Sequence, residues 1–172
     1  MNASRTNHGS VVLKLLFFGV IAAAVIGSLY WVLNQVRMDA ECRENMGTIY
    51  QALEQYELEK GALPTLAYYP DEPFVDADSI RLVLESFGLP PEACICPAGH
   101  TKLQKQGLSY IWNPAMNGAN LTGKPEERQW LLVDAQALAP EIPPPHFGGY
   151  HVLYSDGEIV TLRDPLTALP GL

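Results

Sequence analysis

The feature that most constrains this chain is an uncharged apolar run near its N-terminus. No charged residue falls between Lys14 and Arg37, and residues 11–33 are almost entirely apolar. About 20 apolar residues in a helix are enough to cross the ~30 Å hydrocarbon core of a bilayer. Tyr30 and Trp31 stand near one end of the run, where amphipathic rings favour the headgroup layer. The run therefore predicts one helix that spans a lipid bilayer.

A cleaved signal peptide is the alternative interpretation of this run. Its apolar region normally has about 7–15 residues and ends at a small-x-small cleavage site. Here the run continues through residues 30–33, with no convincing site beyond them. We therefore expect an uncleaved anchor.

The distribution of charge predicts the orientation of the anchor. Of the 11 basic residues only Arg5 and Lys14 precede the uncharged stretch 15–36, whereas all 19 acidic residues follow it. The positive-inside rule then predicts a cytoplasmic N-terminus at 1–10, a transmembrane helix at 11–34 and an exported domain at 35–172. The acidic balance of that domain argues against nucleic acid as a partner, because a phosphate backbone needs a basic surface.

Small residues in the span form a possible packing surface. Gly19, Ala23 and Gly27 recur at i, i+4 and i+8, which places them on one side of a helix. Such a stripe lets another membrane helix approach closely, although Gly and Ala are also common in membrane helices in general. Other membrane helices, including copies of this chain, are therefore expected partners.

A helical pattern continues beyond the span. Residues 34–60 contain no Pro, Gly61 can end a helix, and Pro64 would stop its continuation. Apolar residues recur there at steps of three and four, which draws one stripe on an amphipathic helix: Met38, Cys42, Met46, Ile49, Leu53 and Tyr56. The pattern predicts one helix that runs from the membrane into the core of the exported domain.

Strand patterns dominate the rest of the chain. A second helix is predicted at 80–87, with Asp78 or Ser79 as its N-cap. Four strands follow, at 108–112, 130–134, 151–154 and 159–162. Asp156-Gly157 between the last two is typical of a two-residue type I′ hairpin loop. The predicted fold class is α+β: a long N-terminal helix, half transmembrane and half packed on the domain, with an antiparallel sheet of about four strands.

Several motifs in this layout resemble those of type IV pilins and type II secretion pseudopilins. Cys42-Arg-Glu-Asn45 and the residues up to Pro64 resemble the stretch that follows the membrane helix in a large pilin-like group, and Cys96-Pro97 resembles its Cys-Pro element. The most specific likeness is to the group's His-x9-Asp-Gly signature. It comprises His146, Gly148, Gly149, Asp156 and Gly157, with Asp134 on the preceding strand.

The resemblance implies a non-enzymatic, cofactor-free protein that acts through contacts with pilin-like subunits. It implies the bacterial cytoplasmic membrane as its location, with a periplasmic domain. One residue departs from the pattern. After Gly9, Lys14 stands where prepilins carry a Glu that meets a neighbouring subunit's amine. We therefore expect a minor or accessory component of a type IV pilus or type II secretion-like assembly.

Three cysteines in an exported domain predict one disulfide and one free thiol. Cys42 lies on the apolar stripe and Cys96 occupies the Cys-Pro position, so Cys42–Cys96 is the expected pair and Cys42–Cys94 its rival. The expected bond closes a long loop and should raise the free energy of unfolding by about 3–4 kcal/mol, because it restricts the unfolded chain.

Two other classes of function remain open from the sequence. A tethered binding module could hold a metal at Cys94, Cys96 and His100, or calcium at the acidic loop of Asp71, Glu72, Asp76 and Asp78. A tethered hydrolase could use Ser155 with the histidines and aspartates of the last strands, namely His146, His151, Asp134 and Asp156. For His146 we expect instead a hydrogen bond to Asp134 or Asp156 that holds the final hairpin.

Overall fold

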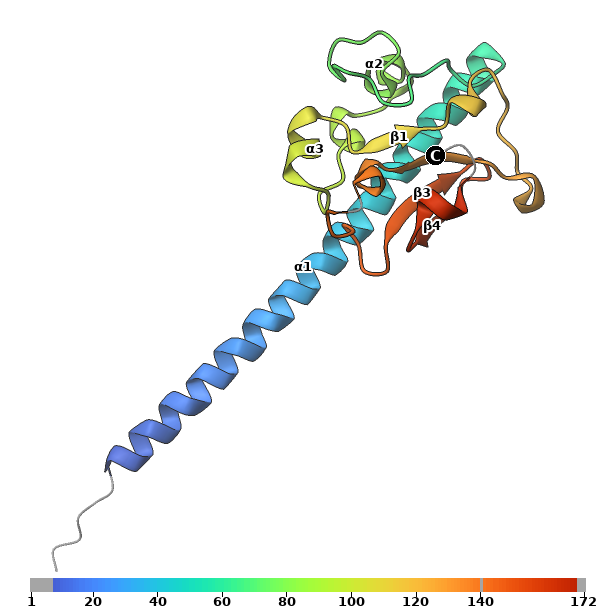
Figure 1. The fold of residues 1–172 in the computed structure, drawn as a ribbon. Coiled ribbons are helices and arrows are strands. Elements are labelled where there is room, and N and C mark those ends of the chain that lie inside the picture. Colours follow the sequence, from blue (N-terminus) through green and yellow to red (C-terminus); the bar gives the residue numbers. More distant parts are fainter. Residues whose placement is uncertain (1–7, 140, 170–172) are drawn as a thin grey trace, which may run out of the picture. The chain divides into compact units, whose positions relative to one another are not determined.

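The computed structural model describes residues 8–139 and 141–169, so most of the predicted cytoplasmic segment, including Arg5, lies outside the described residues. The fold is α+β, as predicted. Helix α1 (His8–Lys60) is followed by one antiparallel sheet of β1 (Tyr110–Trp112), β2 (Trp130–Asp134), β3 (Tyr150–Tyr154) and β4 (Ile159–Leu162), in the order β1-β2-β3-β4 (Figure 1). Short helices lie between these elements: α2 (Ile80–Val83), η1 (Glu85–Phe87), η2 (Pro91–Cys94), α3 (Thr101–Gln106), η3 (Pro114–Met116), η4 (Pro125–Glu127), η5 (Ala135–Leu138) and α4 (Pro165–Ala168).

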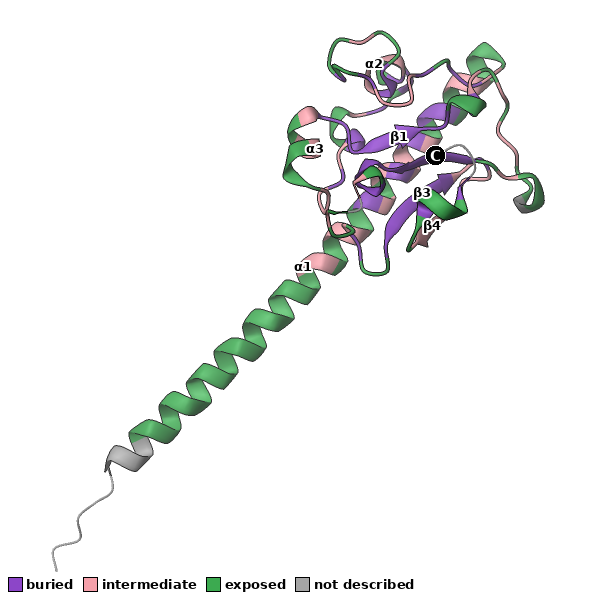
Figure 2. Ribbon diagram, viewed as in Figure 1, coloured by how far each residue is buried: buried purple, intermediate pink, exposed green. Residues whose placement is uncertain are grey.

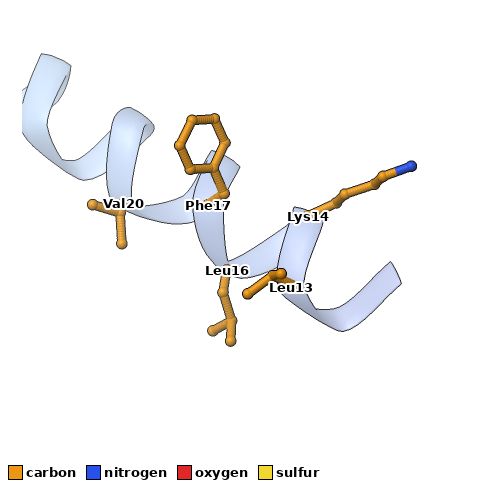
Figure 3. Close-up of a pocket in the computed structure, with 5 residues that line it drawn as sticks. All are labelled: Leu13, Lys14, Leu16, Phe17 and Val20. Carbon is orange, nitrogen blue, oxygen red and sulfur yellow. The ribbon is translucent and has the colours of Figure 1, made fainter. Parts of the chain in front are cut away.

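The chain divides into two compact units, Met1–Arg37 and Met38–Leu172, and α1 contributes to both. In the N-terminal unit the large apolar side chains of residues 12–33 are exposed (Figure 2). By length and composition α1 is able to span a membrane, which is consistent with a single-pass membrane protein. In Figure 3, Leu16 and Phe17 stand out from the helix. Since no described residue covers these side chains, their apolar surface is available to lipid or to another helix.

The core of the C-terminal unit is built on residues 38–60 of α1. Cys42, Met46, Ile49 and Leu53 of the predicted stripe are completely buried. They share one core cluster with residues on one face of the sheet: Tyr110, Trp112, Leu131, Leu132 and Leu153. The opposite face carries a second cluster that includes Ile111, Trp130, Val133, Tyr150 and Val152. The sheet is thus buried on both faces, and α1 covers one of them.

The cysteine pairing agrees with the expectation. Cys42 and Cys96 form a disulfide with their Cα atoms 5.0 Å apart, which ties α1 to the segment before α3. Cys94 is the free thiol, and its burial raises its pKa to about 12. At neutral pH Cys94 is therefore a protonated core side chain rather than a reactive thiolate.

Two local predictions are wrong. The helix expected at 80–87 is broken at Leu84 into α2 and η1. Ser79 does occupy the N-cap position of α2, but its hydroxyl donates to the carbonyl of Pro73 and makes no capping bond. The β3–β4 loop is not type I′, since that turn needs two residues with positive φ and only Gly157 has one. Gly157 N–H donates to the carbonyl of Tyr154, and the Tyr154 amide donates to Glu158, which makes a three-residue loop.

The sequence patterns also missed α3. Its Thr101–Gln106 segment is too short for a clear helical period. His100 supplies its N-cap, because its Nδ1 accepts the Lys102 amide at 3.3 Å, and Gly107 ends it in the left-handed conformation.

The disulfide should make a measurable contribution to stability. We expect Cys42→Ala/Cys96→Ala to lower the free energy of unfolding by about 3–4 kcal/mol, because the bond restricts a long loop in the unfolded chain. Urea denaturation of the full chain in detergent micelles measures this loss. Reduction of the wild type should reproduce it and should change the double variant little; an equal effect of reductant on both proteins would contradict the assignment.

Candidate functional site

Four ionisable side chains meet beside the disulfide, and we call them the histidine cluster: Asp39, Asp134, His146 and His151. Asp39 Oδ1 lies 3.1 Å from both His146 Nδ1 and His151 Nε2. Asp134 Oδ2 lies 3.4 Å from the other ring nitrogen of His146. The two imidazole rings stack with their centroids 3.7 Å apart, and both histidine side chains are fully buried.

Asp39 reaches the cluster from α1, one helical turn before Cys42. Its two carboxylate oxygens have different partners. Oδ1 faces the histidines, whereas Oδ2 accepts from Arg43 Nε at 3.3 Å. Arg43 in turn donates to the Ile159 carbonyl and to Thr161 Oγ1 on β4. These bonds tie Asp39 and its helix turn to the last strand of the sheet.

Strand pairing positions His151 and Asp134. Asp134 is the last residue of β2, and its Oδ2 accepts the backbone amide of His151 at 2.6 Å. His151 pairs with Thr161 across β3 and β4, where its Nδ1 lies 3.0 Å from the Thr161 hydroxyl. A buried carboxylate that accepts a backbone N–H makes a strong charge-assisted bond. The second ring nitrogen of His151 is thereby directed toward Asp39.

A tight turn positions His146. His146 and Gly149 exchange backbone hydrogen bonds, at 3.3 Å and 3.2 Å. Gly148 and Gly149 have φ values of +99° and +140°, a backbone conformation that residues other than glycine rarely adopt. A Cβ atom at Gly149 would also overlap the carbonyl of Leu162. The glycines of the sequence signature therefore have a structural reason: they return the chain from His146 to the start of β3.

The contacts between the two histidines and Asp39 are close but do not have the geometry of hydrogen bonds. Both distances are short, yet neither His146 Nδ1 nor His151 Nε2 has a hydrogen-bond partner of acceptable geometry. The reason is directional, because an N–H lies in the plane of its ring and must point at its acceptor. Two buried ring nitrogens therefore face one carboxylate oxygen without a satisfied hydrogen bond. Such groups in a native core call for an explanation.

Burial also changes the acid–base behaviour of His151. Desolvation, assisted by the neighbouring His146, lowers the pKa of His151 to about 4. Its imidazole is therefore neutral at physiological pH. Because the unfolded chain takes up this proton near pH 6.5, acidification from about 6.5 to 4 favours unfolding.

The structure brings together only part of the predicted signature. Of the signature residues, His146 and Asp134 meet, and His151 of the hydrolase hypothesis lies beside them. Of the two carboxylates expected as partners of His146, Asp134 is the nearby one. Asp156 instead accepts the Glu158 amide in the β3–β4 loop. Ser155, the hydroxyl of the hydrolase hypothesis, accepts the Gln129 amide.

The other predicted sites lie apart from this cluster. Cys96 is bonded to Cys42 and His100 caps α3, so Cys94, Cys96 and His100 do not form a shared ligand set. In the acidic loop, the Asp76 carboxylate accepts the Glu72 amide. Gly19 and Gly27, in the N-terminal unit, have open space beside their Cα atoms.

Sequence reasoning missed the role of Asp39. It was visible only as a charged residue beside an apolar stripe. A usable signal was its position three residues before Cys42: if Cys42 is bonded to Cys96, the carboxylate one turn earlier also faces the domain.

The two signature glycines should differ in their tolerance of a side chain. We expect Gly149→Ala to lower the free energy of unfolding by about 3 kcal/mol or more, since it combines backbone strain with overlap of the Leu162 carbonyl. Gly148→Ala is the matched control, with positive φ but no close backbone atom, and should cost about 1 kcal/mol. Denaturant unfolding of both variants checks the order; equal losses would contradict the described turn.

Comparisons with family models, with curated proteins and with solved structures return no match to this chain. Its long apolar N-terminal helix and small antiparallel sheet are compatible with a pilin-like fold. The functional proposal therefore depends on the fold and on the geometry of its residues.

Proposed function

We propose that this chain is a membrane-anchored, pilin-like or pseudopilin-like protein that works through protein–protein contacts rather than catalysis. The observation that carries the proposal is the contrast within α1. Its residues 12–33 expose their apolar side chains, whereas residues 42, 46, 49 and 53 are fully buried in the C-terminal unit. A single helix that serves first as an anchor and then as the core of a small α+β domain suits a subunit held in a bilayer.

The exposed segment suits lipid and a partner helix. Large apolar side chains occupy most of its surface. One face instead carries only small residues, namely Gly19, Ala23 and Gly27. In lipid, close packing between helices depends on such small residues, because apolar surface alone gains little there. We infer that this face contacts another membrane helix.

Charge supports a defined orientation. Lys14 lies at the start of the apolar segment, and its ammonium group extends outward from the helix (Figure 3). All acidic residues follow the segment. We infer that the N-terminus lies in the cytoplasm of a bacterium and that residues 38–172 are presented on the outer side of the cytoplasmic membrane.

Lys14 also favours an accessory role over that of a major filament subunit. In the pilin-like resemblance its position belongs to a Glu that neutralises a neighbour's terminal amine. A Lys there would place like charges together in an apolar setting, which is costly. We infer a minor component of a pilus-like or type II secretion-like assembly, or an anchored domain that reuses the fold.

Site-specific photo-crosslinking in native membranes tests this proposal. A photoreactive residue at Gly19 or Gly27 should yield a discrete protein adduct, and one at Val25 should yield chiefly lipid adducts, because Val25 lies on the opposite side of the helix. Immunoblotting and mass spectrometry identify the products.

Three outcomes would contradict parts of the proposal. A ladder of identical subunits would overturn the accessory role in favour of a filament subunit. Lipid adducts alone at all three positions would remove the partner helix. Release of the protein by alkaline carbonate without detergent would remove the anchor itself.

A further inference from the structure

The unsatisfied nitrogens of the histidine cluster have a set of donors that matches a metal site. Asp39, His146 and His151 each offer one ligand atom, and these three atoms lie within 4.8 Å of one another. Both nitrogens are buried without a hydrogen bond, and both lie 3.1 Å from the same oxygen. Two imidazoles and one carboxylate form a common ligand set for zinc and related ions.

The distances suit coordination by one ion. Ligand atoms ~2.0–2.1 Å from a tetrahedral zinc ion lie about 3.3–3.4 Å from one another. The two O···N distances in the cluster are 3.1 Å, so small side-chain movements are enough to fit an ion among them. The stacked rings must also turn so that each ring plane contains the ion. Rotation about the Cβ–Cγ bond of histidine has a broad intrinsic energy profile, so the bond itself allows this turn.

The outer contacts of the cluster are those of a metal centre. Metal-bound histidines usually hold a second polar group with their other ring nitrogen. His151 Nδ1 lies 3.0 Å from Thr161 Oγ1, and His146 Nε2 lies 3.4 Å from Asp134 Oδ2. In both rings the outer nitrogen has a partner and the inner one does not. This arrangement leaves one lone pair of each ring free for an ion once the outer nitrogen carries the proton.

Charge and access also favour a cation. Asp39 and Asp134 supply two carboxylates against the single guanidinium of Arg43, so the surroundings have an excess of negative charge. Asp39 keeps 28% of its side chain exposed, whereas the histidines are fully buried. An ion can therefore arrive from the Asp39 side, and water can complete its coordination there.

We propose that Asp39, His146 and His151 bind one divalent first-row transition metal ion, for which zinc is the natural probe. The ion would link α1 to β3 and to the turn before it, and so act as a structural clamp on the fold. Nitrogen donors distinguish this site from one for calcium or magnesium, which prefer oxygen ligands throughout. The proposal is independent of the membrane partner and goes beyond the proposed function.

The test uses the full chain in detergent micelles, purified without a polyhistidine tag and with the disulfide intact. Isothermal titration with ZnCl₂ should give one ion per chain. Free zinc at 100 times its dissociation constant should raise the Tm by about 5–10 °C. EDTA should reverse the rise. MgCl₂ at the same concentration should leave the Tm unchanged.

Variants assign the site. Asp39→Asn keeps the shape of a partly exposed side chain and should weaken zinc binding at least 10-fold; His151→Gln should abolish the Tm rise. His100→Gln removes a histidine outside the cluster and should behave like the wild type. If His151→Gln fails to fold, Asp39→Asn still decides the matter.

Four results would overturn the proposal. They are no zinc binding by the wild type, unchanged binding in folded Asp39→Asn, loss of binding in His100→Gln, or binding that requires reduction of the disulfide. The last result would place the ion on Cys42 and Cys96 instead.

Discussion

Burial of one face of α1 against the sheet is the interaction on which the rest of the C-terminal unit depends. Completely buried residues recur along this face from Cys42 to Leu53, at the spacing of a helix stripe. Apolar side chains of this size each stabilise a fold by about 1.5–3 kcal/mol when fully buried. Polar contacts follow the same helix: Asn45 donates to the Ile95 carbonyl, and Glu57 accepts from Asn120. Cys42 of the disulfide and Asp39 of the histidine cluster lie near the start of residues 38–60 and tie this part of α1 to the rest of the C-terminal unit.

The same helix faces two different surroundings along its length. Residues 12–33 are almost entirely apolar and no described residue covers them, whereas residues 38–60 combine buried apolar positions with exposed charged ones. A helix that is apolar all round needs an apolar environment, whereas an amphipathic helix needs a core on one side. The change between the two patterns takes place near Arg37, where the chain divides into its two units.

Periodicity was enough to predict the α+β class, the extent of α1 and the bounds of β2 and β4, because long or strictly alternating patterns carry a strong signal. Short elements gave no such signal. The break at Leu84 and the helix α3 depend on single hydrogen bonds and on glycines such as Gly107. The β3–β4 loop was assigned to the wrong turn because Asp-Gly suits several turns, and the backbone of Asp156 decides among them.

The candidate site was partly predictable for a related reason. His146 and Asp134 were identified through a sequence signature, but their meeting with Asp39 needs the register of β3 against β2 and the packing of α1. These are long-range relations that one sequence does not display. The reason for the two glycines after His146 is their positive φ and, at Gly149, the close approach of the Leu162 carbonyl.

Cooperative unfolding of two truncated chains tests most directly whether the C-terminal unit is built on residues 38–60. Both chains would be exported with a cleavable signal and measured by circular dichroism without detergent. Residues 38–172 should form a soluble monomer with one sharp thermal transition, whereas residues 61–172 should show none, because the sheet loses the helix that covers it. A sharp transition at the same temperature in both chains, or aggregation of 38–172 that only detergent prevents, would contradict this account of the fold.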